Sequence, residues 1–493
     1  MSVAERSWEL AVALDRAGGT PVFLQIAGSL SDDIRRGRLR PGQPLPGTRR
    51  LAATLGVNRN TVVAAYEELQ AEGWIETDAA RASRVSSALP DPRPQRSAGG
   101  GRRAAVPART GYDLPPLPLL PNDGVRPQAE LVFGSGVPDL RLVPVAALAR
   151  AYRRALRQRG RTLLDYAAPE GLPRLRAALA GMLAATRGLA AGPDDLLITR
   201  GSQMALALVA RALVTPGDLV AVEAIGYVPA RAAFALAGAR LAPLPVDGQG
   251  LDVEALEALA RRGPVRAVYL TPHHHYPTTV TLSPGRRLRL LEVARAHRIA
   301  VIEDDYDHEF HYDGRPVLPL ASVDRAGVVV YVGTLSKILA PGLRVGYVVA
   351  PAPLLSRLAA LRSALDTQGD PAIEDAVAEL LEDGEVQRHV RRVRRIYRDR
   401  RDALADALRR HLGGRVSFDV PAGGVAFWAR STGAIDVIEW ARRALQAGVF
   451  FSPGGWFAFD GRPLPFLRLG FACLTESEIA EAVRRLARTR PGK

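Results

Sequence analysis

The chain has 493 residues, enough for more than one domain, and 47% of them are hydrophobic, as in ordinary globular proteins. It contains no apolar run of about 18 residues, which excludes a membrane-spanning helix. Its start lacks the basic residues and the apolar stretch of a secretion signal. Cys473 is the only cysteine, which excludes an intrachain disulfide and a cysteine-based metal site. We expect a cytoplasmic protein without membrane association.

The net charge of +15 favours polyanionic partners, nucleic acid first, although a coding bias toward arginine would also produce it. Lysine occurs only at Lys337 and at Lys493, the last residue. Arginine replaces lysine at most exposed sites, but a guanidinium stays protonated and cannot act as a nucleophile. The one internal lysine therefore indicates chemistry at Lys337.

Residues 12–86 are predicted to form a small helical domain. Apolar residues recur at helical spacing over residues 23–34, and further helices are predicted over 48–55 and 59–71. The last two helices are joined by Gly56-Val57-Asn58, in which the asparagine can cap the helix that follows. Two helices joined by such a turn indicate a helix-turn-helix.

In a helix-turn-helix, the start of the second helix enters the major groove of DNA. Here that start is Arg59, Asn60 and Thr61; arginine can pair with guanine and asparagine with adenine. Arg49, at the start of the preceding helix, is placed for a phosphate or groove contact. The alternative is a solvated helical hairpin in a protein-interaction domain, because the same geometry serves other purposes.

The segment 22–75 resembles the winged helix of the GntR family over its whole length. The resemblance implies double-stranded DNA as a partner, and a wing formed by residues 74–76 and Val85. The chain departs from the family at the wing tip, where Thr77-Asp-Ala-Ala-Arg-Ala-Ser-Arg lacks the usual glycines. Arg81 and Arg84 could still contact phosphate there.

Residues 87–128 are rich in proline, arginine, glycine and alanine and lack apolar periodicity, which predicts a linker. In residues 129–490, helical patterns alternate with short strand patterns, which predicts an α/β domain with a mainly parallel sheet. The clearest predicted strands are residues 218–222, 267–270, 300–302 and 328–332.

The segment 330–347 predicts a strand that leads into a loop of small and hydroxyl residues and then into Lys337. Thr334, Ser336 and Arg344 flank the lysine in sequence, and such groups suit a phosphate monoester whose carbonyl lies within reach of the amine. Pyridoxal 5′-phosphate (PLP) has this chemistry. The alternative, a capped loop with a surface lysine, does not explain why lysine is so rare elsewhere.

Two further segments could contribute to such a site. Residues 199–204 predict a strand end, a glycine turn and a helix start, where the backbone amides of Ser202 and Gln203 could bind phosphate. A simple helix cap would show the same pattern. Tyr227 could lie against the face of the cofactor ring, or it could be a half-buried core tyrosine.

An apolar strand runs into Glu303-Asp-Asp-Tyr306, and carboxylates at the C-terminal ends of strands lie where α/β sheets bind ligands. PLP requires one carboxylate beside its ring nitrogen, and a nearby phenol can bind the ring oxygen. The alternative is an acidic Mg²⁺ site. It fits less well, because it gives Lys337 no role and the chain lacks a nucleotide-type phosphate loop.

Together these motifs resemble the fold-type I aminotransferases across residues 129–490, and with the N-terminal domain the chain is similar to MocR/GabR-type transcription regulators. The resemblance implies a winged helix-turn-helix joined to a PLP-dependent transferase domain with a smaller C-terminal α+β subdomain. It also implies that Lys337 holds PLP as a Schiff base, that Asp304 meets the pyridine nitrogen and that Tyr306 meets the ring hydroxyl. Asp305 is the alternative partner of the nitrogen, because the spacing differs from that of aminotransferases by one residue.

The resemblance further implies a homodimer, since fold-type I sites are built at a dimer interface, and two heads would favour separated DNA half-sites. The remaining roles that it implies are phosphate binding by Thr334, Ser336 and Arg344, stacking on the ring by Tyr227, contact with the neighbouring subunit's phosphate by Tyr166, and binding of an effector's carboxylate by Arg468.

Two stretches depart from the family: Pro277-Thr278-Thr279 stands for the usual Pro-Thr-Gly, and residues 423–428 replace a stretch that often carries histidine on the effector side. The run His273-His274-His275 does not predict a metal site, because alternate side chains of a strand point to opposite faces. No cysteine or carboxylate ligand pattern accompanies it.

We expect a transcription regulator whose large domain senses PLP or an amino-acid-like effector through different affinities for two conformations. One alternative is a functional aminotransferase with an auxiliary DNA-binding head, for which the set of residues is nearly intact. Another is a PLP-storage protein, which would not need Arg59 and Asn60 on a recognition helix. The effector, the operator and the direction of regulation do not follow from the sequence.

Overall fold

The computed structural model describes residue 14 and residues 20–77, 82–89, 110–114, 129–134, 136–314 and 317–491. The chain divides into two compact units, Met1–Pro115 and Pro116–Lys493. The division falls inside the predicted linker, most of which lies outside the described residues. Among the residues described, no helix has both the length and the apolar character needed to cross a membrane.

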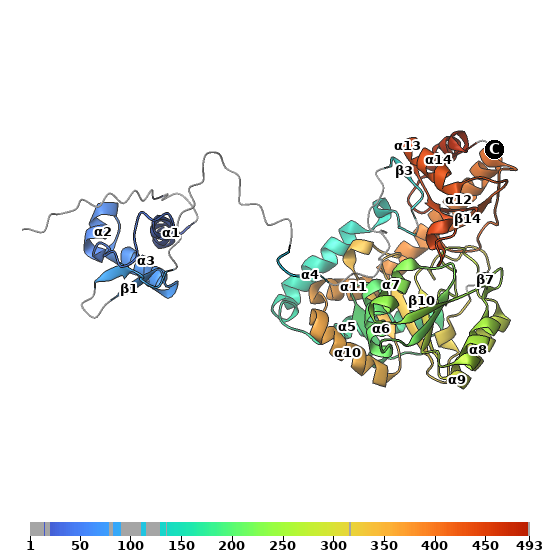
Figure 1. Cartoon of the computed structure of the whole chain (residues 1–493), viewed down its shortest axis with the longest axis horizontal. Coiled ribbons are helices and arrows are strands. Elements are labelled where there is room, and N and C mark those ends of the chain that lie inside the picture. Colours follow the sequence, from blue (N-terminus) through green and yellow to red (C-terminus); the bar gives the residue numbers. More distant parts are fainter. Residues whose placement is uncertain are drawn as a thin grey trace, which may run out of the picture. The chain divides into compact units, whose positions relative to one another are not determined.

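The small unit, called the head below, has the predicted winged-helix elements (Figure 1). They are α1 (Val22–Arg35), α2 (Thr48–Leu55), α3 (Arg59–Ala71), β1 (Ile75–Thr77) and β2 (Ser83–Val85). The bounds of α2 and α3 are those predicted. The two strands pair antiparallel with Ile75 opposite Val85, as expected for a wing. The wing tip, including Arg81, lies outside the described residues.

One apolar core holds the three helices of the head together. It includes side chains that are at most 1% exposed, among them Ile26, Leu30, Leu51, Val62 and Leu69. Because these residues recur at helical spacing, each helix turns one face inward and leaves the opposite face in solvent.

The turn between α2 and α3 is defined by two residues. Gly56 adopts a φ of 60°, which disfavours side chains. Asn58 caps α3 by accepting a hydrogen bond from the Asn60 amide at 2.9 Å. These two features orient the start of α3, which carries Arg59.

The large unit is built on a seven-stranded sheet with the order β4-β12-β11-β10-β9-β5-β6. Only β12 runs antiparallel to its neighbours, so the predicted mainly parallel sheet is confirmed. The strands are β4 (Leu196–Thr199), β5 (Leu219–Glu223), β6 (Arg240–Leu244), β9 (Ala267–Leu270), β10 (Ala300–Asp305), β11 (Val329–Thr334) and β12 (Gly346–Val349).

Helices cover this sheet, and its strands other than the edge strand β6 are buried on both faces, as continuous apolar runs require (Figure 1). One face packs on α6, α7 and α10, and the other on α5, α8, α9 and α11. The helices of this layer structure are α4 (Val145–Leu163), α5 (Pro173–Arg187), α6 (Ser202–Leu213), α7 (Val228–Leu236), α8 (Val253–Arg262), α9 (Pro284–His297), α10 (Ala352–Asp366) and α11 (Pro371–Glu382), and a hairpin of β7 (Val246–Asp247) and β8 (Gly250–Leu251) lies outside the sheet.

The C-terminal part forms the expected smaller α+β subdomain, drawn in orange and red in Figure 1. Its antiparallel sheet has the order β13-β14-β17-β16. Its elements are α12 (Glu385–Leu412), β13 (Val416–Ser417), β14 (Ala426–Ser431), α13 (Val437–Gln446), β15 (Val449–Phe450), β16 (Ser452–Pro453), β17 (Phe466–Gly470) and α14 (Glu476–Thr489). The short strand β3 (Leu131–Val132), far away in sequence, pairs with β15.

Two sequence-based expectations for the large unit were wrong. Strand β10 continues to Asp305, three residues beyond the predicted 300–302, because the carboxylates at its end find partners inside the fold. The run from His273 to His275 is not part of a strand, since β9 ends at Leu270 and the amide of Thr271 bonds to the carboxylate of Glu223 at 3.2 Å. The strand-face argument against a metal at these histidines therefore does not hold.

Candidate functional site

Lys337 lies in a turn directly after β11, held in place by the loop around it. The Thr334 hydroxyl donates to the Ser336 hydroxyl at 2.9 Å and accepts from the Ser336 amide at 3.1 Å. The Leu335 amide bonds to the Val345 carbonyl at 3.0 Å, which ties the loop to the start of β12. The predicted loop of small hydroxyl residues is thus an ordered turn that presents one amine.

The amine of Lys337 lies in a low-dielectric setting. Burial lowers its pKa below the ordinary value for lysine, while the charges of Asp307 and Asp304 partly oppose this effect. A lysine with a lowered pKa has a larger neutral, nucleophilic fraction at neutral pH. Lys337 therefore has the electrostatic character of an amine that reacts with a carbonyl.

Asp304 and Asp305 point to opposite faces of the sheet, as neighbours on a strand must. The Asp304 carboxylate accepts a hydrogen bond from the Tyr269 hydroxyl at 2.8 Å, on the face covered by α6 and α7. The Asp305 carboxylate accepts one from the Tyr331 hydroxyl at 2.6 Å, on the opposite face, and lies 3.5 Å from Arg187. The two carboxylates therefore lie on opposite faces of the sheet and have different partners.

The two acids also differ in charge state. Burial raises the pKa of Asp304 to about 7. Burial favours the neutral acid at Asp305 too, but His308 and Arg187 hold the pKa of that carboxyl well below its ordinary value. Asp304 keeps one buried oxygen, Oδ1, without a hydrogen-bond partner among the described residues. An unpaired acceptor with a raised pKa suits a cationic N–H donor such as a pyridinium.

The start of α6 lies against the Lys337 loop through a close approach of two glycines. A Cβ on Gly346 would lie 2.6 Å from the carbonyl carbon of Gly201, so neither backbone could come as near with a side chain at Gly346. Gly201 has a φ of 78° and precedes Ser202, the first residue of α6. The free backbone amides of a helix start favour a phosphate group.

Arg344 borders this turn from the other side. Its guanidinium donates to the Arg200 carbonyl at 2.6 Å, and its backbone adopts a φ of 53°, unusual for a residue with a side chain. The side chain is exposed within the chain. Gln203 of α6 bonds away from this turn, to the carbonyl of Pro229 at 3.0 Å.

Three tyrosines lie near the acids. The Tyr227 and Tyr276 rings pack edge to face at 5.2 Å, and the Tyr276 and Tyr306 rings do so at 6.0 Å. The Tyr306 hydroxyl donates to the carbonyl of His274 at 3.1 Å. Tyr227 is half-buried at the start of α7, so one ring edge stays accessible.

Arg468 is a buried guanidinium on β17, only 1% exposed. It donates to the carbonyl of Pro277 and lies 4.3 Å over the ring of Tyr276. Its Nε has no hydrogen-bond partner, and no carboxylate among the described residues forms an ion pair with it. A buried arginine of this kind is prepared to receive a carboxylate in a bidentate pair.

The Pro277-Thr278-Thr279 departure falls where the backbone favours glycine. Thr279 has a φ of 67°, and its amide closes a turn onto the carbonyl of His275 at 2.7 Å. The Thr278 hydroxyl lies 2.6 Å from Nδ1 of His275. The turn therefore keeps the left-handed geometry despite the missing glycine.

Tyr166 stands apart from these residues. It is 87% exposed and lies shortly after α4, with its amide bonded to the carboxylate of its neighbour Asp165. Within one chain it contacts none of the residues above through a described hydrogen bond. Leu164, two residues before it, is 76% exposed, so two large hydrophobic side chains are exposed in this segment.

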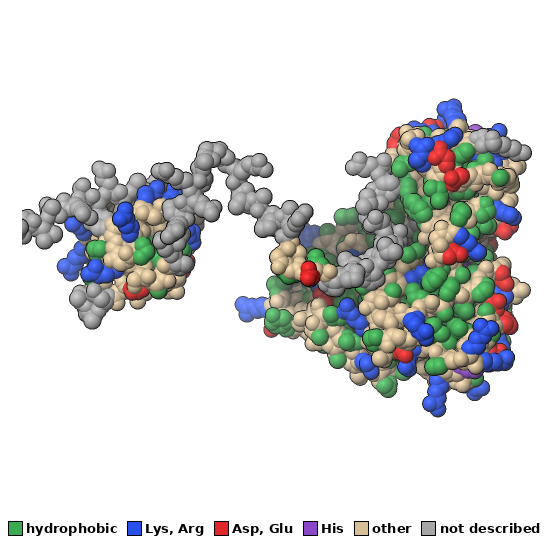
Figure 2. Space-filling view, viewed as in Figure 1, with side chains coloured by type: hydrophobic (Ala, Val, Ile, Leu, Met, Phe, Trp, Pro, Cys, Tyr) green, Lys and Arg blue, Asp and Glu red, His purple; other side chains and the backbone are tan. Residues whose placement is uncertain are grey.

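The predicted DNA-contacting residues lie on the surface of the head. Arg49, Arg59 and Asn60 are exposed and Thr61 is half-buried. Figure 2 shows basic side chains projecting from several sides of the head. The start of α3 thus presents hydrogen-bonding groups to solvent, as a groove-binding helix requires.

Sequence reasoning missed several buried residues that support the site. They include Tyr269, which bonds Asp304, and Asp307, whose charge acts on Lys337. Glu223, 2% exposed, receives hydrogen bonds from the amide and hydroxyl of Thr271. Strand residues such as Tyr269 looked like core, and only the pairing of β9 with β10 brings its hydroxyl to a carboxylate.

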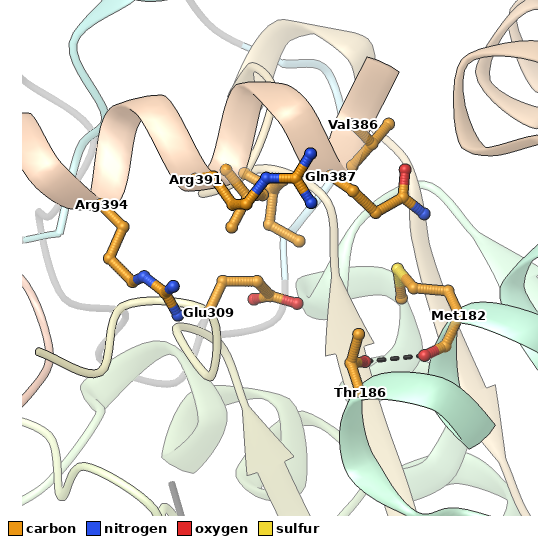
Figure 3. Close-up of a pocket in the computed structure, with 9 residues that line it drawn as sticks. Met182, Thr186, Glu309, Val386, Gln387, Arg391 and Arg394 are labelled. Atoms are coloured by element: carbon orange, nitrogen blue, oxygen red, sulfur yellow. Dashed lines mark hydrogen bonds between the residues drawn. The ribbon is translucent and has the colours of Figure 1, made fainter. Parts of the chain in front are cut away.

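A separate cavity lies behind the Lys337 loop, lined by Ile338, α5 and α12 (Figure 3). Arg391 and Arg394 project into it from α12, and Arg394 points toward Glu309 (Figure 3). Glu309 already accepts a hydrogen bond from the buried Arg187 at 2.5 Å. None of the predicted functional residues lines this cavity.

Comparison with known proteins gives a consistent result for both units. Residues 129–486 match the family described as aminotransferase class I and II, and residues 23–85 match bacterial regulatory proteins of the gntR family. The chain is 33% identical to the probable rhizopine catabolism regulatory protein MocR of Rhizobium meliloti, over 96% of this chain and 95% of that protein. It is 34% identical to the HTH-type transcriptional regulator TauR of Rhodobacter capsulatus, over 93% and 94%.

A solved structure resembles the large unit closely. It is LysN, an α-aminoadipate aminotransferase of Thermus thermophilus, complexed with N-(5′-phosphopyridoxyl)-L-leucine. It is 35% identical to this chain with a TM-score of 0.68, over 73% of this chain and 91% of LysN. The part of this chain that matches LysN does not include the head.

Proposed function

The chain belongs to the MocR-type regulators, in which a gntR-family head is joined to an aminotransferase class I and II domain, and we propose that its large unit binds PLP and senses that cofactor or an amino-acid-like effector. One observation carries this proposal. The same chain combines an exposed helix start at Arg59 with an amine at Lys337 whose pKa is lowered by burial, and with buried, incompletely partnered groups at Asp304 and Arg468.

Each group has a role that follows from its surroundings. Lys337 supplies an amine of lowered pKa for the aldehyde of PLP. Asp304 supplies the unpaired Oδ1 for the protonated ring nitrogen, and Tyr269 holds the other oxygen in place. Asp305 also keeps an unpaired Oδ1, but it lies on the opposite face beside Arg187, whereas the charge of Asp304 acts on Lys337, which favours Asp304 for this role. When bound, PLP supplies an electrophilic carbonyl and an electron-withdrawing ring.

The phosphate is proposed to lie at the start of α6. The Ser202 amide and the hydroxyls of Thr334 and Ser336 border this turn, and Arg344 adds a positive charge. Gln203 contributes its backbone amide only, since its side chain is bonded to Pro229.

The cofactor ring is proposed to lie between the acids and the tyrosines. Tyr306 would meet the ring oxygen, and Tyr227 would pack on the ring face. Arg468 would bind the carboxylate of an amino-acid-like effector, because its Nε is buried and unpaired.

We propose a homodimer in the cytoplasm, where DNA is accessible. The exposed Tyr166 and Leu164 support it, since an aromatic and an aliphatic side chain so exposed suit a subunit contact. Tyr166 would then reach the phosphate of the partner subunit. Two heads would bind two DNA half-sites.

Sensing requires that a ligand bind two conformations with different affinities. An effector carboxylate at Arg468 would draw β17 of the C-terminal subdomain toward Lys337 on the large sheet. This domain closure would change how two heads are spaced and thus the affinity for paired half-sites.

The test is selection of DNA sites by the full-length protein from a random pool, followed by affinity measurement with and without PLP and a panel of amino acids. We expect sequence-specific binding whose affinity changes by about 5–150-fold with PLP or one amino acid, the usual range of allosteric coupling. Absence of any sequence-specific retention would overturn the proposal.

A second candidate function is transamination, favoured by the match of residues 129–486 to aminotransferase class I and II. Steady-state assays with amino and keto acids decide between the two. Sustained turnover at about 1–1000 s⁻¹ without specific DNA binding would identify an enzyme.

A further inference from the structure

A cluster of histidines lies beside the proposed cofactor site and has no role in it. His273 and His274 follow β9, and His311 follows β10. One nitrogen from each of the three rings lies within 4.8 Å of the others. The ring centroids of His273 and His274 are 4.2 Å apart, and those of His274 and His311 are 6.0 Å apart.

The rings of His273 and His274 are buried, and several ring nitrogens of the cluster lack a hydrogen-bond partner. His273 and His274 are 4% and 3% exposed. Both ring nitrogens of His273, and Nδ1 of His311, lack a hydrogen-bond partner among the described residues. Buried polar atoms nearly always have hydrogen-bond partners. These unpaired nitrogens therefore indicate that a bound ligand supplies the missing partner.

The third ring is oriented in the way that metal-binding histidines are. Nδ1 of His274 lies 2.8 Å from the carboxylate of Asp307, so the carboxylate accepts the Nδ1 proton and the lone pair remains on Nε2. A carboxylate behind a histidine of this kind fixes the tautomer and increases the basicity of the ligand nitrogen. Gly423 lies close to Nε2, and any side chain at this position would collide with it, because a Cβ there would lie 2.2 Å from Nε2.

The surroundings cover the cluster on one side. The ring of His273 stacks on His308, with 4.4 Å between the ring centroids. His311 is half-buried and leaves a route for an ion from solvent.

We propose that His273, His274 and His311 form a binding site for one divalent first-row transition ion of the Zn²⁺ class. Three imidazole nitrogens are ligands that such ions prefer, whereas Mg²⁺ and Ca²⁺ require oxygen ligands. Three protein ligands leave a fourth position for water or another donor.

The proposed metal site would lie next to residues that we assign to the cofactor site and next to the C-terminal subdomain. The carbonyl of His274 accepts the hydrogen bond from Tyr306, and the His311 backbone pairs with Gly423 of the C-terminal subdomain. A bound ion therefore links the loops after β9 and β10 and lies next to the junction with that subdomain.

The experiment uses the full-length, PLP-loaded protein after treatment with a chelator and dialysis. Zn²⁺ alone is titrated against a chromophoric competitor. We expect one ion per chain, with an X-ray absorption spectrum that shows nitrogen ligands at about 2.0–2.1 Å and no sulfur. Binding of no Zn²⁺, or sulfur in the first coordination shell, would overturn the proposal.

Variants assign the ligands. His273→Gln and His311→Gln are expected to remove stoichiometric binding, and Asp307→Asn to weaken it by about 10–100-fold. His411→Gln, on α12 outside the cluster, is the matched control and should bind as the parent does. Retained binding in both cluster variants would overturn the assignment. Far-UV circular dichroism checks that each variant is folded, and if the buried His273 variant is not, the half-buried His311 variant decides.

Discussion

The head and the large unit carry their functional residues in opposite ways. In the head, Arg49, Arg59 and Asn60 are exposed, and the fold beneath them only orients them. In the large unit, Asp304 and Arg468 are buried, and each is held by a neighbour from another strand or loop. A single substitution on the exposed surface of the head can change which DNA sequence it binds. In the buried site of the large unit, removal of one supporting residue disturbs the geometry of the whole site.

Because of this difference, mutations in the head and mutations in the large unit should affect different properties. A change at the start of α3 should alter DNA binding and leave the cofactor site intact. A change around Lys337 should alter cofactor binding while the head, whose core is its own, still binds DNA. The four predictions below test this independence.

The largest effect is expected for Lys337→Ala. It removes the only amine in the described site, so the absorbance of PLP linked to the protein as a Schiff base should disappear completely. Non-cooperative binding of the head to DNA should persist, measured on a single half-site by fluorescence anisotropy. Survival of the bound-cofactor absorbance would show that Lys337 is not the attachment point.

The next effect distinguishes the two acids of β10. Because the pKa of Asp304 is raised from 3.8 to about 7, the folded, cofactor-free protein binds a proton that the unfolded chain has lost, and stability falls as the pH rises between these values. Asp304→Asn should therefore stabilise the cofactor-free protein at pH 8, by on the order of 2–4 kcal/mol, while weakening PLP binding.

Asp305→Asn is the matched control and should lower the free energy of unfolding, whereas Asp304→Asn should raise it. The depressed pKa of Asp305 contributes stability above pH 3.8 that is lost in acid, and Arg187 would keep a buried charge without this partner. We expect a loss of about 3–5 kcal/mol at neutral pH, measured by urea unfolding of the large unit. Equal responses of the two variants would contradict the assignment of opposite faces.

Arg59→Ala is expected to weaken a specific DNA site by about 1–3 kcal/mol and to relax its sequence preference. Arg50→Ala, an exposed arginine of α2 that is not among the predicted contacts, serves as the control. The cofactor absorbance should be unchanged in both. An undiminished affinity of the Arg59 variant for the selected site would refute the role of α3 in recognition.

The smallest effect is expected for Asn58→Ala. It removes the hydrogen bond from the Asn60 amide that caps α3, and should cost the head about 1 kcal/mol of stability. Asn58→Asp keeps an acceptor at the same position and should lose much less. Thermal unfolding of the head transition, followed by circular dichroism, measures both.

The sequence predicted local structure better than tertiary support. The bounds of α2, α3 and β9 follow from periodicity and capping, which act between residues close in the chain. The motif around Lys337 was recognisable for the same reason, since its loop, lysine and arginine are consecutive. The roles proposed for Ser202, Tyr227 and Arg468 rested on resemblance.

What could not be predicted depends on contacts between distant segments. Tyr269 supports Asp304 only because β9 and β10 are adjacent. Whether Asp304 or Asp305 faces Lys337 depends on strand register, which a one-residue shift would reverse. The histidine run was misjudged because a strand was assumed where Pro272 and Pro277 begin and end a loop.

The short strand β3 has a mechanical consequence for the whole chain. The amides of Leu131 and of Phe133, which follows β3, donate hydrogen bonds at 2.9 Å to the carbonyls of Gly448 and Phe450, in the subdomain that carries Arg468. Residues 131–133 are therefore held by the C-terminal subdomain and not by the seven-stranded sheet. If the subdomain turns as it closes on a ligand, as proposed above, these residues should turn with it, although no ligand contacts the head.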